Sequence, residues 1–253
     1  MIVITGSSYG AGEWSEATPG SPPVILHNGL AQYLEDSGNE VINLSQPGGV
    51  PGYVYTSILD NFLTLNTRLS KVDKIFVFES NWTDNFLHVL KQQQNNLVDY
   101  ELLLKSNYLE FISYCQYKFY AQLSKIGTKF NIPIFLIGAI NDIIWTDDFS
   151  KSHPMVNISC QSFINLVLHN NHRIQEPVVG VFTSRHVELV DYIKPKLSNT
   201  DFTLFINHLD NNQYRLKQII ANKGEFFCAD GVHASRKSHK ILFDFLKETI
   251  PNL

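Results

Sequence analysis

Two adjacent serines, Ser7 and Ser8, stand in the glycine-rich segment GSSYGAGEW, directly after a short apolar run at the start of the chain. A glycine-rich turn after a strand can bind phosphate, bind a dinucleotide or present a nucleophile. A phosphate-binding loop needs a Gly-Lys-Ser/Thr ending, and the first lysine of the chain is Lys71. The dinucleotide fingerprint G-x-G-x-x-G is met only at Gly10 and Gly12. We therefore favour a serine nucleophile.

A serine nucleophile needs an imidazole that takes its proton and a carboxylate that orients the imidazole. The segment CADGVHASRKSHK, near the other end of the chain, contains both groups. Asp230 and His233 are three residues apart and come just before a predicted helix, so one turn can present both side chains to the same site. A D-x-x-H motif alone arises often by chance, so it supports a catalytic site only when other matching motifs occur in the same chain.

Five short apolar runs, separated by longer helical patterns, are typical of buried parallel strands. The runs cover residues 2–5, 40–44, 74–78, 132–137 and 178–182. Strand alternating with helix predicts an α/β fold, a three-layer α/β/α sandwich around a mainly parallel, five-stranded, doubly wound sheet of the flavodoxin-like kind.

The helical patterns cover residues 22–38, 54–71, about 97–130 and 238–250. The least regular part of the chain is 145–201, where we expect an insertion beside the site or at the sheet edge. The sequence has no internal repeat and no convincing linker, so we expect a single domain over residues 1–253.

Three blocks, in the correct order, resemble those of the SGNH (GDSL-type) hydrolases. GSSYGAGE is similar to the first block, G-D-S-x-x-x-G, at Gly6, Ser8 and Gly12. Ser7 stands where this family usually has Asp. NLSQPGGV resembles the second block, with its glycine at Gly48, and DGVHASRKSHK resembles the last block, D-x-x-H. The chain also looks close to SGNH-like proteins of tailed-phage genomes.

The resemblance implies a role for each of these residues, and the roles are also chemically consistent. Ser8 attacks an acyl carbonyl, His233 acts as general base, and Asp230 holds the imidazole in the useful tautomer. The backbone N–H groups of Ser8 and Gly48, together with one asparagine side chain, stabilise the oxyanion.

Two asparagines compete for the third block of the family, G-x-N-D. FESNWTD puts Asn81 directly after the third predicted strand, with Ser80 in place of glycine. IGAIND puts Asn141 after the fourth strand, with one residue too many after Gly138. In a sheet of this type the third strand lies beside the first, next to Ser8, so we favour Asn81.

The three tryptophans, Trp14, Trp82 and Trp145, fall near the ends of the first, third and fourth predicted strands. At the rim of a parallel sheet they could bind substrate, by stacking on a sugar ring or by holding an acyl chain. The alternative interpretation is that these large side chains close the top of the core.

Composition excludes several classes of protein. The net charge is −4 and no cluster of Lys or Arg is longer than a pair, so we expect no nucleic-acid partner. No segment approaches the roughly 20 apolar residues of a membrane span, and the start is not a secretory signal, so we expect no membrane partner. The predicted location is cytoplasmic, which for a phage-encoded chain is the host cytoplasm.

The histidines and cysteines, residue types that can bind metals or form disulfides, match no known spacing motif. Nine histidines form neither H-x-H nor H-E-x-x-H, so we expect neither a metal nor another cofactor. The three cysteines, Cys115, Cys160 and Cys228, are widely and irregularly spaced, which favours free thiols over a disulfide framework.

These observations predict a serine esterase that removes a short, acetyl-like acyl group from a carbohydrate or small-molecule ester. Two alternatives stay open. Because Ser7 and Ser80 depart from the family pattern, the chain could be a binding or structural protein with a degenerate site. The same triad could also transfer the acyl group to an acceptor other than water.

Overall fold

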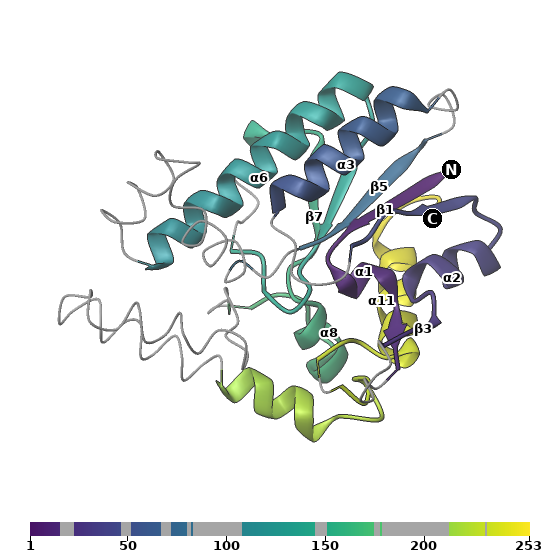
Figure 1. Ribbon diagram of the computed structural model, residues 1–253, viewed down its shortest axis with the longest axis vertical. Coiled ribbons are helices and arrows are strands. Elements are labelled where there is room, and N and C mark those ends of the chain that lie inside the picture. Colours follow the sequence, from purple (N-terminus) through teal and green to yellow (C-terminus); the bar gives the residue numbers. More distant parts are fainter. Residues whose placement is uncertain are drawn as a thin grey trace.

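The fold is built on one parallel sheet. The structure, a computed structural model, describes residues 1–15, 23–46, 52–66, 72–79, 82, 108–144, 151–174, 178, 213–230 and 232–253. In these residues the sheet has the strand order β4-β1-β5-β6-β7, and every neighbouring pair is parallel. Its strands are β1 (Ile2–Gly6), β4 (Val41–Asn43), β5 (Lys74–Phe78), β6 (Ile134–Ile137) and β7 (Val156–Cys160). The predicted α/β class with a parallel five-stranded sheet is confirmed (Figure 1).

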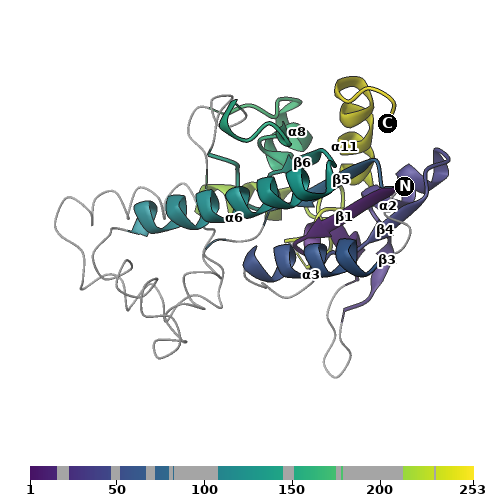
Figure 2. The same ribbon diagram turned by 90° about the horizontal axis from the view of Figure 1, so that it is seen from above.

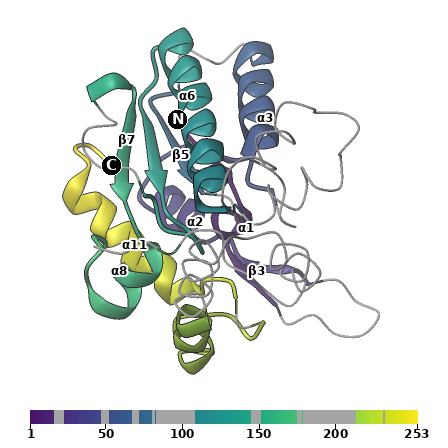
Figure 3. The ribbon, with the colours of Figure 1, turned by 90° about the vertical axis from the view of Figure 1, so that its left-hand side faces the viewer.

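Helices cover both faces of the sheet and complete the three layers (Figure 2). The helices are α3 (Gly52–Leu65) and α6 (Tyr108–Phe130) on one face, and α2 (Leu30–Asp36), α8 (Phe163–His169) and α11 (Arg236–Thr249) on the other. Figure 3 shows α3 and α6 side by side. Alternate strand residues point to opposite faces, so Val3 joins the core under α3 and α6, whereas Ile2 and Ile4 join the other core.

The position of β1 between β4 and β5 creates a point at which a site can form. Its neighbours are β4 on one side and β5 on the other, so the chain leaves β1 at the point where the strand order reverses. Beyond β1 come the short helix α1 (Ser8–Ala11) and the two-residue strand β2 (Glu13–Trp14). β2 pairs in antiparallel fashion with β3 (Ile25–His27).

The fifth strand of the described sheet is not one of the predicted runs, and residues 179–182 of the last run lie outside the described residues. Of the predicted residues 178–182 the structure describes only Val178, which is outside any strand. The fifth strand is β7, inside the segment 145–201 that the sequence marks as an insertion. β7 lies at the sheet edge and leaves Asn157 exposed, so it lacks the continuous apolar run of a strand buried on both faces.

The first predicted helix is also partly wrong. Within residues 22–38 the structure has β3 followed by α2, which begins only at Leu30. Gly29 separates the two elements with φ of 56° and ψ of −130°, a conformation that interrupts a helix. The apolar residues Val24 and Leu26 continue the helical spacing by coincidence, and both are exposed in the structure.

The other predicted helices agree with the structure where it describes them. α3 covers residues 52–65, and α6 begins at Tyr108. Residues 67–71 and 97–107 of the predicted helices lie outside the described part of the chain. α11 begins at Arg236, because the Ser235 side chain caps it by accepting a hydrogen bond from the backbone of Ser238.

Cys160 and Cys228 are buried and form no disulfide bond. Burial raises the pKa of the Cys228 thiol to about 12, so this thiol stays protonated at neutral pH. Among the helices that the structure describes, none combines the length and the apolar character needed to cross a membrane.

Candidate active site

Ser8 is held at the carboxyl end of β1 by a turn that only glycine permits. Gly6 has φ of 112°, and a Cβ atom there would lie 2.0 Å from the carbonyl oxygen of Phe78 on β5. The next residue, Ser7, donates its backbone N–H to that same oxygen at 3.1 Å. β1 therefore passes close against β5 before α1 begins, and Ser8 is presented as the first residue of α1.

Asp230 shapes the loop that carries His233. One carboxylate oxygen, Oδ1, accepts the backbone N–H groups of Val232 at 2.9 Å and His233 at 3.0 Å. The other oxygen, Oδ2, bonds to Nδ1 of the His233 ring. The loop is closed by a hydrogen bond of 2.7 Å from the backbone N–H of Cys228 to the carbonyl of His233.

The structure brings Ser8, His233 and Asp230 together. Nε2 of His233 lies 2.7 Å from Oγ of Ser8, although the two residues are 225 positions apart in the chain. Since Nδ1 faces a carboxylate, the ring proton belongs on Nδ1, and Nε2 is left to accept the hydroxyl proton of Ser8. This is the geometry that general-base activation of a serine requires.

Asp230 is ionised in this arrangement. Partial burial by itself disfavours the charged carboxylate. The hydrogen bond and charge of His233, together with the backbone N–H groups of Val232 and His233, outweigh burial and hold the pKa of Asp230 below its ordinary value. A negative charge is thus in place at neutral pH to stabilise an imidazolium ion.

The two adjacent serines have different surroundings. Ser8 contacts the imidazole, whereas Ser7 is buried and its Oγ has no hydrogen-bond partner among the described residues. The geometry therefore favours Ser8 over Ser7 as the nucleophile.

Two aromatic side chains pack against the His233 ring. The Trp14 ring lies 5.4 Å from the imidazole, measured between centroids, and the Tyr9 ring lies 5.9 Å away. The Tyr9 hydroxyl donates to the carbonyl of Val232, and the Trp14 indole N–H donates to the carbonyl of Ser8 at 3.2 Å. Sequence reasoning missed these contacts with the base, because no local pattern links Tyr9 or Trp14 to a loop more than 200 residues away.

The tryptophans do not share one environment. Trp14 is only 9% exposed, and Trp82 is 1% exposed, with its ring packed edge-on against Phe119 of α6. This burial agrees with the alternative interpretation, in which large aromatic side chains close the top of the core. Trp145 lies outside the described residues, and substrate binding by the tryptophans stays a prediction.

Of the predicted oxyanion-hole residues, the structure describes Ser8 and the competing candidate Asn141. Gly48 and Asn81 lie outside the described residues. The sheet order does place β5, the strand before Asn81, directly beside β1, and this adjacency is the premise on which we favour Asn81. Asn141 follows β6, which β5 separates from β1, and it is fully buried.

A buried ion pair follows directly after Asn141. The Asp142 carboxylate accepts two hydrogen bonds from the Arg215 guanidinium, at 2.6 and 2.7 Å, and one from the backbone of Val178 at 2.8 Å. The two Arg215 bonds tie the helical residues 213–221 to the segment that follows β6. Within the segment IGAIND, the Asp therefore has a clear structural role.

Glu79 is a buried carboxyl group at the end of β5, two residues before Asn81. Its Oε1 accepts hydrogen bonds from the Tyr120 hydroxyl and from Nε2 of Gln116 at 2.9 Å, while Oε2 has no partner among the described residues. Burial raises the pKa of Glu79 to about 8, so the side chain is largely uncharged at neutral pH.

Glu79→Gln should make the protein more resistant to unfolding in mildly alkaline solution. The pKa of Glu79 is about 8 in the folded chain against 4.5 as its ordinary value, so folding favours the protonated form. Stability from this group is complete below the unfolded pKa and is lost as pH rises through the folded pKa. Between about pH 5 and about pH 8 the wild type should lose about 3 kcal/mol of unfolding free energy that Glu79→Gln keeps.

Urea unfolding at a series of pH values measures this difference. Glu35→Gln, which changes an exposed carboxylate on α2, is the matched control and should follow the wild-type curve. If Glu79→Gln and the wild type lose stability in parallel as pH rises, the carboxyl group of Glu79 is already charged in the folded protein.

The fold and the site together define a class: an α/β protein with a serine, a histidine and an aspartate in hydrogen-bond contact at the switch point of its sheet. No protein-family model matches the sequence, and no curated protein is detectably similar to it.

Similar solved structures include several named as lipases or esterases. One is a lipase from a goat rumen metagenome, with 15% identity, a TM-score of 0.40, and coverage of 98% of this chain and 96% of that chain. Another is a catalytic mutant of an acetylxylan esterase from Geobacillus stearothermophilus, with 13% identity, a TM-score of 0.41, and coverage of 99% and 93%. A third is a lipolytic protein of the G-D-S-L family from Veillonella parvula, with 12% identity, a TM-score of 0.38, and coverage of 100% and 98%.

Proposed function

We propose that this chain is a serine ester hydrolase in which Ser8 is the nucleophile, His233 the general base and Asp230 the orienting carboxylate. The observation that carries the proposal is the continuous hydrogen-bonded chain from Ser8 Oγ through both imidazole nitrogens to Asp230. A serine placed for structural reasons alone has no need of a base aligned in this way.

The reaction follows from this geometry in two halves. Ser8 Oγ attacks the acyl carbonyl carbon as its proton moves to Nε2 of His233, and Asp230 stabilises the imidazolium ion. The imidazolium then protonates the leaving alkoxide, which departs as an alcohol and leaves an acyl group on Ser8. Water then attacks the acyl-enzyme as the same Nε2 takes its proton, and the imidazolium returns that proton to Ser8 Oγ as the bond to the acyl group breaks and the acid is released.

The oxyanion formed in each half needs hydrogen-bond donors. As the first residue of α1, Ser8 has a backbone N–H that no intrahelical carbonyl accepts, and we propose it as one donor. Gly48 N–H and the Asn81 side-chain amide are the other proposed donors. Each donor of this kind contributes on the order of 3 kcal/mol to transition-state stabilisation.

For the substrate we propose a short acyl ester, such as an acetyl ester, of a carbohydrate or other small molecule. This part of the proposal rests on the sequence, through the tryptophans near the strand ends. Rates measured on a p-nitrophenyl ester series of increasing acyl length test it, and the acetyl ester should react fastest.

Covalent labelling by a fluorophosphonate probe tests the nucleophile directly. The wild type should gain one probe adduct, located by mass spectrometry on the peptide that contains Ser8. Ser7→Ala should be labelled to the same extent and should unfold at about the wild-type temperature, because the Ser7 hydroxyl has no partner to lose among the described residues. A correctly folded wild type that resists the probe would instead support a binding or structural protein with a degenerate site.

Acyl transfer uses the same first half-reaction and differs only in the acceptor. Product analysis with added alcohols or sugars separates the two outcomes. Free acid as the main product supports hydrolysis, and a new ester as the main product supports transfer.

A further inference from the structure

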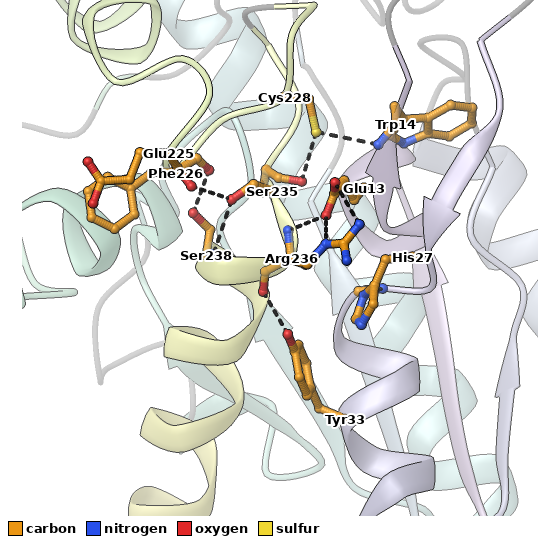
Figure 4. A network of polar contacts seen from close by, with 12 residues as sticks. Glu13, Trp14, His27, Tyr33, Glu225, Phe226, Cys228, Ser235, Arg236 and Ser238 are labelled. Atoms are coloured by element: carbon orange, nitrogen blue, oxygen red, sulfur yellow. Dashed lines mark hydrogen bonds and ion pairs between the residues drawn. The ribbon is translucent and has the colours of Figure 1, made fainter.

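Glu13 and Arg236 connect the two segments that carry the proposed catalytic groups. Glu13 comes five residues after Ser8, and Arg236 comes three residues after His233. The backbone N–H of Arg236 donates to Glu13 Oε2 at 2.8 Å, and its guanidinium donates to Oε2 at 2.8 Å and to Oε1 at 3.3 Å (Figure 4). A single carboxylate therefore holds both the main chain and the side chain at the start of α11.

This contact is favourable for physical reasons on both sides. Arg236 is the first residue of α11, where backbone N–H groups lack intrahelical acceptors and the helix dipole favours negative charge. Although burial disfavours the charged form of Glu13, the hydrogen bonds and charge of Arg236 outweigh it and lower the pKa of Glu13. The Glu13 side chain is 15% exposed and Arg236 is 57% exposed, so the carboxylate is the more buried partner.

A second connection joins the same two segments. The backbone N–H of Trp14 donates to Cys228 Sγ at 3.4 Å, and the Cys228 thiol donates to the carbonyl of Ala234 at 3.2 Å. Trp14 also contacts the carbonyl of Ser8 and the ring of His233. Trp14 thus contacts the loop that carries the base, Glu13 contacts the start of α11, and β2 itself is paired with β3.

We propose that Glu13 and Arg236 are positioning residues, whose ion pair sets the alignment of Ser8 Oγ with His233 Nε2. The inference rests on the proposed function, because alignment of these two atoms matters for an esterase. Without the ion pair, the start of α11 and the loop before it can shift relative to α1. A misplacement of about 1 Å between reacting groups can cost about 100-fold in rate.

Kinetics of matched variants test the proposal. Arg236→Gln removes the charge but leaves the backbone N–H bond to Glu13, and should lower kcat by about 10-fold. Glu13→Ala removes every bond and should lower kcat by about 100-fold, with KM changed by less than about threefold. Arg236→Lys should recover part of the loss. The control is Lys240→Gln, which breaks another exposed ion pair of α11, with Asp244, and should keep wild-type kcat.

The histidine side-chain proton spectrum supplies a readout that does not depend on turnover. A proton on Nδ1 of His233 that is shared with Asp230 should give a strongly downfield resonance, assigned by its loss in His233→Gln. This resonance should shift or broaden in Glu13→Ala and stay unchanged in Lys240→Gln. Glu13→Ala and Arg236→Gln that keep both wild-type kcat and the wild-type resonance would overturn the positioning role.

The two proposals fail in different ways. If the wild type neither hydrolyses esters nor reacts with fluorophosphonate, the proposed function is wrong, while the resonance still decides whether Glu13 and Arg236 hold the histidine. If the wild type is active and the variants match it, only the positioning role is wrong. Should Glu13→Ala fail to fold, Arg236→Gln decides the matter, because its side chain is largely exposed.

Discussion

Ser8→Ala should lower kcat/KM for p-nitrophenyl acetate by a factor of about 10⁵ or more. The variant loses the hydroxyl oxygen that lies 2.7 Å from His233 Nε2, so no acyl-enzyme can form on this residue. A small residual rate should remain, because oxyanion stabilisation and substrate binding do not depend on the Ser8 hydroxyl. Steady-state kinetics with the purified variant, together with a circular dichroism spectrum to verify its fold, measure the effect.

Ser7→Ala is the matched comparison for this experiment. Both variants remove one hydroxyl from the same turn, and the residues differ by one position in the chain. Ser7→Ala should keep kcat/KM within about threefold of wild type, since Ser7 Oγ has no partner among the described residues. The reverse pattern, with activity lost in Ser7→Ala and kept in Ser8→Ala, would transfer the nucleophile to Ser7.

The second large effect is expected for Asp230→Asn, which should lower kcat by about 10⁴. Asn keeps an oxygen that can accept the backbone N–H groups of Val232 and His233, so the loop keeps its shape. Its NH₂ group, however, donates toward Nδ1 and moves the ring proton to Nε2. In that tautomer Nε2 points a hydrogen at Ser8 Oγ and cannot take the hydroxyl proton.

Comparison with Asp230→Ala separates tautomer control from loop shape. Asp230→Ala loses the backbone hydrogen bonds as well, so it should unfold at a lower temperature than Asp230→Asn. Activity of Asp230→Asn within about tenfold of wild type would show that the carboxylate does not control the imidazole, and would remove Asp230 from the proposed triad.

Much of the fold could be predicted because its central strands are buried on both faces. β1, β5 and β6 lie in the middle of the sheet and read as apolar runs, and so they are found directly. β7 lies at the edge of the described sheet and contains the exposed polar residue Asn157, so it lacks the apolar run by which the other strands are recognised. β3 cannot be recognised from the sequence, because its apolar residues continue the helical spacing of α2.

The candidate site was predictable to the extent that its chemistry is local. Ser8 stands in a glycine-rich turn, and Asp230 and His233 are three residues apart, so short motifs identify them. The contacts of Tyr9 and Trp14 with the base-bearing loop, and of Glu13 with the start of α11, join positions more than 200 residues apart. No periodicity or motif encodes such pairs, because they depend on how β2 and α11 meet in space.

The separation of Ser8 and His233 in the chain also has a consequence for biosynthesis. During translation Ser8 emerges well before its proposed base, which is 225 positions later, in the loop before α11. A nascent chain can build β1, β4, β5 and β6 while its serine is still an ordinary, unactivated alcohol. In the proposed mechanism Ser8 is therefore activated only after the loop of His233 and α11 have docked, so ester hydrolysis would report that this part of the fold has formed.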